Sequence, residues 1–214
     1  MISYKDLREK LDTGDIVLFS GKGGISTGIK WFSKSKWSHV GMILRIPEWD
    51  MVLLLESTTL SNLKDLQTGR IVKGVQLVPF SERLKTYDGG LAIRFLTVNR
   101  TPEMLKAISD FRRQISGTLY ESDYLELIKS AYDGPFGLNK EDLSTLFCSE
   151  LLAECYQRMG LLSEKLPSNE YTPKDFSSEG KIKLLSGSLS KEFELKKYKN
   201  DGQYDWFKTQ DDVE

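Results

Sequence analysis

A cysteine and a histidine are the two side chains of this sequence that could combine in nucleophilic catalysis. Cys148 lies in the segment 145–159, whose apolar residues recur at the spacing of one helix face: Leu151, Leu152, Cys155 and Met159. His39 is the only histidine among 214 residues and lies in the segment 36–44, which is typical of the start of a strand. A thiolate attacks an acyl carbon and an imidazole moves its proton, so the pair indicates thiol-based acyl chemistry.

The helix around Cys148 determines the environment of the thiol. Ser144 and Thr145 are both suitable N-caps, and the residue types leave the choice between them open. Gly160 is suited to end the helix. Either cap places Cys148 in the first turn, where the positive end of the helix dipole favours the thiolate. The alternative is that Cys148 is a small buried hydrophobe, as most free cysteines are.

A catalytic imidazole also needs a third polar group that fixes its tautomer. The segments 38–46 and 51–57 flank a turn at 47–50 and predict a β-hairpin. Antiparallel pairing would bring Glu56, at the end of the second strand, beside His39 at the start of the first. Glu56 follows four apolar residues, which is an unusual place for a solvated acid, although the end of a strand can simply meet water. We favour the orienting role.

The remaining pattern predicts an α+β domain, because strands dominate the first half and helices the second. We expect strands at 16–20, 71–79 and 91–98, and short strands within 180–198. We expect helices at 3–11, 101–115 and 122–133, a short helix beginning at Ser26 or Thr27, and another beginning at Thr172. We expect a polar tail at 199–214. We expect a single domain over 1–214 with its core at 13–177.

Composition excludes several classes of protein. Basic and acidic residues number 30 and 31, so the charge gives no support for a nucleic-acid partner. Two cysteines and one histidine make a structural zinc site improbable, and no other metal or cofactor is indicated. Seven residues of helix place Cys148 and Cys155 roughly 10.5 Å apart, beyond disulfide reach. With no apolar signal region and no membrane-spanning run, we expect a cytoplasmic protein. The oligomeric state is left open.

Five segments together resemble a known family: Thr13–Phe19, Ser38–Ile43, Leu55–Ser57, Phe147–Leu151 and Tyr171–Asp175. They resemble the circularly permuted branch of the NlpC-like papain-fold superfamily, which includes relatives of lecithin:retinol acyltransferase and bacterial permuted peptidase-like proteins. The histidine precedes the cysteine in the chain, which is the permuted order.

The resemblance implies a papain-like fold, in which a small antiparallel sheet packs against the helix that carries the nucleophile. It implies Cys148 as nucleophile, His39 as base and Glu56 as the third member of a catalytic triad. The acyltransferase relatives place a second histidine where this chain has Glu56, so the peptidase-like proteins are the better match.

Residues near the pair are candidates for substrate binding. Trp37 and Ser38 adjoin the histidine, and Tyr171 lies in the last matched segment. The aromatic and lysine residues of 30–37 could form a rim that binds substrate or lipid, or they could be ordinary packing with solvated lysines.

Two further groups on the cysteine helix have simpler explanations. Cys155 faces the core and is expected to be structural. Glu150 and Glu154 could pair for glycoside hydrolysis, but one polar helix face explains them more simply.

Three functions compete. The first is a cysteine peptidase or amidase that cleaves amide bonds in a small peptide or a cell-wall-type amide. The second is a lipid acyltransferase or thioesterase that uses the same thiol, and the third is a non-catalytic binding module. The presence together of Cys148, His39 and Glu56 favours an enzyme, and the natural substrate is left open.

Overall fold

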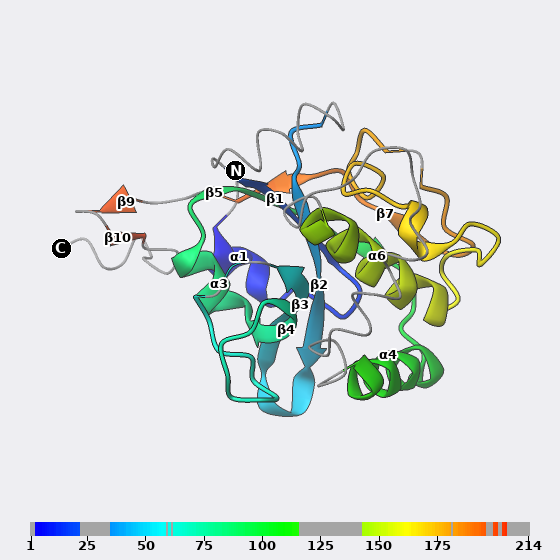
Figure 1. Cartoon of the computed structure of the whole chain (residues 1–214), viewed down its shortest axis with the longest axis horizontal. Helices are drawn as coiled ribbons and strands as arrows, with labels where there is room; N and C mark the ends of the chain where they lie inside the picture. The colour runs from blue at the N-terminus through cyan, green and yellow to red at the C-terminus, as the bar shows by residue number, and fades with distance from the viewer. Residues whose placement is uncertain are drawn as a thin grey trace.

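The computed structural model of the chain describes residues 3–21, 35–58, 60, 62–115, 143–180, 182–195, 199–200 and 203–204 (Figure 1). The expected helices at 122–133 and after Ser26 lie outside these residues, as do 205–214 of the tail. Within them the helices are α1 (Tyr4–Arg8), η1 (Pro47–Trp49), α3 (Phe80–Thr86), α4 (Pro102–Ile115), α6 (Leu143–Arg158) and η2 (Ser168–Glu170). The strands are β1 (Ile16–Gly21), β2 (His39–Ile46), β3 (Met51–Thr58), β4 (Gly74–Pro79), β5 (Gly89–Arg94), β6 (Leu96–Thr97), β7 (Ser188–Leu189), β8 (Phe193–Glu194), β9 (Lys199–Asn200) and β10 (Gln203–Tyr204).

An antiparallel sheet of six strands, in the order β4-β3-β2-β1-β5-β8, organises the chain. The expected hairpin is confirmed: β2 and β3 pair antiparallel, with Ile46 opposite Met51 and Gly41 opposite Glu56. The α+β class is also confirmed, because helices cover a purely antiparallel sheet.

Alternation along the strands sends apolar side chains to both faces of the sheet. One face packs against α4 and α6 through residues that include Leu53 and Leu55. The other face packs against α1 and α3 through residues that include Val52 and Leu54. Figure 1 shows the two pairs of helices on opposite sides of β2 and β3.

The cysteine helix differs from the expectation at its start. Helix α6 begins at Leu143, so Ser144 and Thr145 lie inside it and neither is the N-cap. Cys148 is therefore the sixth helical residue, beyond the first turn in which the dipole acts most strongly. Serine and threonine favour caps but are tolerated within helices, which is why their presence did not mark the boundary. At the other end Gly160 has a φ of +68°, as expected of a residue that ends a helix.

The buried carboxylate of Asp15 explains why the expected strand 91–98 is divided. Its Oδ1 accepts the backbone N–H of Leu96 at 2.8 Å and a hydrogen bond from Arg100 at 3.0 Å, and its Oδ2 accepts the N–H of Asp12 at 2.9 Å. These bonds draw the chain away from the sheet after Arg94.

Two further segments differ from the pattern. Helix α3 was not expected, because its seven residues are too short for a clear helical period. Thr172 begins a turn instead of a helix, since the Asp175 carboxylate accepts hydrogen bonds from its N–H at 2.9 Å and its hydroxyl at 2.7 Å.

Asp15→Ala should lower the free energy of unfolding by about 3 kcal/mol, because it leaves three donors without their acceptor inside the protein. Urea denaturation followed by circular dichroism measures this. Asp110→Ala is the matched control, since Asp110 pairs with Lys106 and Arg113 on the exposed surface of α4. The control should change stability by less than about 0.5 kcal/mol, and an equal effect of both substitutions would contradict the role of Asp15.

Candidate active site

His39 and Glu56 are brought together by the β2–β3 hairpin, as the sequence predicted. The His39 Nε2–H donates to Glu56 Oε2 at 2.9 Å. His39 is the first residue of β2 and lies beyond the last registered pair of the ladder, Gly41 opposite Glu56. Its ring packs against Phe19 of β1, with the ring centroids 4.9 Å apart.

Gly41 makes room for this contact. A Cβ atom at this position would lie 3.0 Å from the carbonyl oxygen of Leu55 and 3.2 Å from the Cβ of Glu56. Because alternate residues of a strand share a face, position 41 lies on the same face as His39 and directly opposite Glu56. A side chain there would crowd the start of the Glu56 side chain.

Glu56 has further partners that the sequence did not reveal. Its Oε1 accepts hydrogen bonds from Gln76 Nε2 of β4 at 3.0 Å and from Arg83 Nε of α3 at 2.8 Å. Arg83 Nη2 lies 2.7 Å from the same oxygen, and both side chains are fully buried. The Gln76 carbonyl oxygen has no hydrogen-bond partner within the part of the chain that is described, so this amide serves Glu56 as a donor.

The sequence marks these two residues to different degrees. Phe80, Arg83 and Leu84 are the buried residues of α3, but three positions in a helix of seven residues are too few to establish a helical period, so Arg83 carried no clear signal. Gln76 interrupts an apolar strand and lies opposite Glu56 once β3 and β4 are paired.

Cys148 reaches the same cluster from α6, on the other face of the sheet. Its thiol is a hydrogen-bond partner of the His39 ring. Because Nε2 of His39 is engaged by Glu56, Nδ1 is the ring nitrogen left for the thiol. The three residues therefore form a chain of contacts from thiol to imidazole to carboxylate. Cys148 is only 1% exposed, so the thiol, like the Glu56 carboxylate, is buried.

The pKa values follow from these contacts. Burial alone would lower the pKa of His39, but the charge and hydrogen bond of Cys148, followed by those of Glu56, raise it to about 9. Burial would raise the pKa of Glu56, but the hydrogen bond from His39 and the positive charge of Arg83 lower it. The geometry thus favours an imidazolium beside a carboxylate.

The three expected substrate-binding residues are all buried and have protein partners. Trp37 Nε1 donates to Glu192 at 2.9 Å, and Ser38 Oγ donates to the Phe19 carbonyl at 3.4 Å. The Tyr171 carbonyl accepts a hydrogen bond from Ser149, the neighbour of Cys148, at 2.6 Å. The Ser38 and Tyr171 contacts therefore fix the chain next to His39 and Cys148, whereas the Trp37 contact joins this segment to Glu192.

Three other residues of α6, Cys155, Glu150 and Glu154, were functional candidates from the sequence. Cys155 is fully buried, and burial raises the pKa of its thiol. Burial and the nearby Glu154 raise the pKa of Glu150 to about 7. Glu154 forms an ion pair with Arg158 at 2.9 Å, as a polar helix face would.

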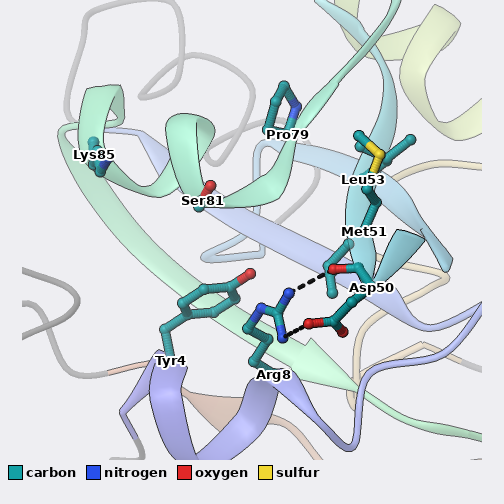
Figure 2. Close-up of a pocket in the computed structure, with 9 residues that line it drawn as sticks. Tyr4, Arg8, Asp50, Met51, Leu53, Pro79, Ser81 and Lys85 are labelled. Carbon is teal, nitrogen blue, oxygen red and sulfur yellow. Dashed lines mark hydrogen bonds and ion pairs between the residues drawn. The ribbon is translucent and has the colours of Figure 1, made fainter. Parts of the chain in front are cut away.

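A cavity of about 420 Å³ lies at the opposite end of the hairpin, near the η1 turn. It is lined by Tyr4 and Arg8 of α1, residues 50–53, Pro79, Ser81 and Lys85. Figure 2 shows Arg8 directed at Asp50, with which it forms an ion pair at 2.9 Å. Neither a cysteine nor a histidine is among the lining residues, so the cavity does not offer the chemistry of the Cys148 site.

Comparison with known proteins leaves the family open. No protein-family model and no curated protein matches the chain. Among solved structures, the chain is similar to the metalloprotein yiiX from Escherichia coli O157:H7, with 16% sequence identity and a TM-score of 0.45. The match covers 70% of this chain and 66% of that one.

The described residues contain no group of three or more histidine, cysteine, aspartate or glutamate side chains that could hold a metal ion. None of their helices is both long and apolar enough to cross a membrane.

The raised pKa of His39 predicts a pH-dependent stability. Its contribution is complete below about pH 6.5, the unfolded value, and is lost as pH rises through the folded value of about 9. The loss should reach on the order of 2–3 kcal/mol. Urea denaturation from pH 6 to pH 10, compared between wild type and His39→Gln, isolates this part. Parallel pH profiles would contradict the assignment.

Gly41→Ala should reduce stability by about 1–3 kcal/mol through crowding, and it should slow the alkylation of Cys148 by displacing Glu56. Thermal unfolding and mass-spectrometric labelling rates measure the two effects. The matched control is Gly90→Ala in β5, where a Cβ would lie 3.5 Å from the Ser20 Cβ, an ordinary contact. Normal labelling in a folded Gly41→Ala protein would show that Glu56 tolerates the methyl group.

Proposed function

We propose that this protein is a thiol hydrolase of the papain-like type that cleaves amide bonds, with Cys148 as nucleophile, His39 as base and Glu56 as the group that orients the imidazole. The observation that carries the proposal is the chain of contacts from the Cys148 thiol through His39 to the buried Glu56. Each member is the residue type that its role requires.

The chemistry runs in two halves. Cys148 transfers its proton to His39, and the thiolate sulfur attacks the amide carbon. His39 returns the proton to the leaving amine, which departs as the carbon–nitrogen bond breaks and a thioester remains on Cys148. His39 then takes a proton from water and the hydroxyl attacks the thioester carbon. The carbon–sulfur bond breaks, the carboxylic acid leaves, and His39 returns the proton to sulfur to regenerate the thiol. Glu56 accepts the Nε2–H bond throughout and stabilises the imidazolium.

The arrangement of elements supports a circularly permuted papain-like fold within this proposal. Helix α6, which carries the cysteine, packs against β2 and β3 of an antiparallel sheet. The histidine strand precedes the cysteine helix in the chain, as in the permuted branch that the sequence resembles.

Amide substrates are preferred over lipids because the aromatic and lysine segment is already engaged where it is described. Trp37 is 2% exposed, and Lys36 pairs with Glu192 at 3.3 Å and Glu194 at 3.0 Å. Trp31 and Phe32 lie outside the described residues. A panel of peptide amides, acyl esters and acyl thioesters, assayed with wild type and Cys148→Ala, tests the preference. Turnover of acyl lipids alone would favour the acyltransferase or thioesterase alternative.

Brief treatment with iodoacetamide at neutral pH should label Cys148 and spare Cys155. Both thiols are at most 1% exposed. A difference between their labelling rates would therefore reflect the imidazole beside Cys148 and not a difference in solvent exposure. Peptide mass mapping identifies the labelled site. Glu56→Gln should still be labelled at Cys148, but several-fold more slowly, because a neutral amide does not stabilise the imidazolium.

Cys148→Ala is the control and should take up no label under these conditions. Preferential labelling of Cys155, or equal rates in wild type and Glu56→Gln, would contradict the assigned roles.

A further inference from the structure

The two oxygens of Glu56 serve different partners. Oε2 accepts from His39 at 2.9 Å, whereas Oε1 accepts from Arg83 at 2.8 Å and Gln76 at 3.0 Å. Arg83 is itself fixed, because its Nη1 donates to Asn62 Oδ1 at 2.8 Å. Orientation of the imidazole needs only the first contact, so the role of a fully buried guanidinium on the second oxygen requires an explanation.

The charges of the cluster provide one. The Arg83 guanidinium cancels the Glu56 carboxylate, so the cluster is neutral when Cys148 is a thiol and His39 is neutral. It is neutral again after the proton passes from Cys148 to His39. Without Arg83, the cluster would carry one uncompensated negative charge both before and after this transfer, which is costly in a low-dielectric interior. A proton taken up by His39 from solvent, with Cys148 still a thiol, would then be what neutralises the cluster.

We propose that Arg83 is a positioning residue that balances the charge of Glu56, so that His39 takes its proton from Cys148 rather than from solvent. The inference rests on the proposed function for Cys148 and His39. In this step the S–H bond of Cys148 breaks and an N–H bond of His39 forms, while Glu56 and Arg83 keep their charges.

The surrounding groups agree with this balance. Cys148 and Glu56 both raise the pKa of His39, so the imidazole has an acidic group on either side of it. Gln76 faces Glu56 from β4 and carries no charge. Tyr87, which follows α3, also faces the cluster, and burial followed by the Glu56 charge raises the pKa of its phenol, so it stays neutral.

The test compares Arg83→Gln, which can still donate a hydrogen bond but is neutral, with Arg83→Lys, which keeps the charge. In the full chain, the pH midpoint of Cys148 alkylation should move up by about one unit or more in Arg83→Gln. Arg83→Lys should stay within about half a unit of wild type. The single histidine gives an unambiguous NMR titration, so in a Cys148→Ala background Arg83→Gln should raise the His39 midpoint by about one unit.

A folded Arg83→Gln protein with the wild-type alkylation midpoint would overturn the proposal, as would equal shifts in the Gln and Lys variants. If Arg83→Gln does not fold, the double variant Glu56→Gln/Arg83→Gln decides, because it removes both charges together. Its midpoint should lie within about half a unit of wild type, and a shift of a full unit in either direction would overturn the charge-balance argument.

The failure of this inference can be distinguished from failure of the proposed function. Alkylation requires no substrate, so an inactive amide panel leaves the test valid. Wild-type Cys148 that reacts no faster than Cys155 would refute the nucleophile itself. A reactive wild type with no response to Arg83→Gln would refute the role of Arg83 alone.

Discussion

The buried carboxylate of Glu56 is the interaction on which the rest of the site depends. It joins β2, β3, β4 and α3 through His39, Gln76 and Arg83. A buried charge is tolerated only when its partners are in place, so the position of each element is tied to the others. Cys148, on the opposite face, completes the arrangement through the same imidazole.

The sequence alone predicted that Cys148, His39 and Glu56 lie close together. One histidine and two cysteines limited the choice, and the hairpin between 38 and 57 placed Glu56 beside His39 by antiparallel pairing alone. Local patterns of this kind are reliable because the turn and both strands lie within twenty residues of each other.

Contacts that depend on tertiary packing could not be predicted in this way. Arg83 belongs to a helix of seven residues, too short to show a period, and its partner lies 27 positions earlier in the chain. The start of α6 was missed because serine and threonine occur both at caps and within helices. Division of the strand at 91–98 depends on Asp15, about eighty residues away.

The apolar run of β3 has a consequence for how the sheet assembles. Residues 52–55 are apolar and point alternately to the two faces of the sheet. If this strand paired one residue out of register, each of these side chains would move to the opposite face, where it would still be buried among apolar residues. Such a register shift would therefore cost little hydrophobic burial. The same register shift would turn Glu56 toward the face that packs against α6. Arg83 would then be buried without a negatively charged partner. The Glu56 carboxylate therefore also favours the correct strand alignment during folding, which the surrounding hydrophobic residues alone do not specify.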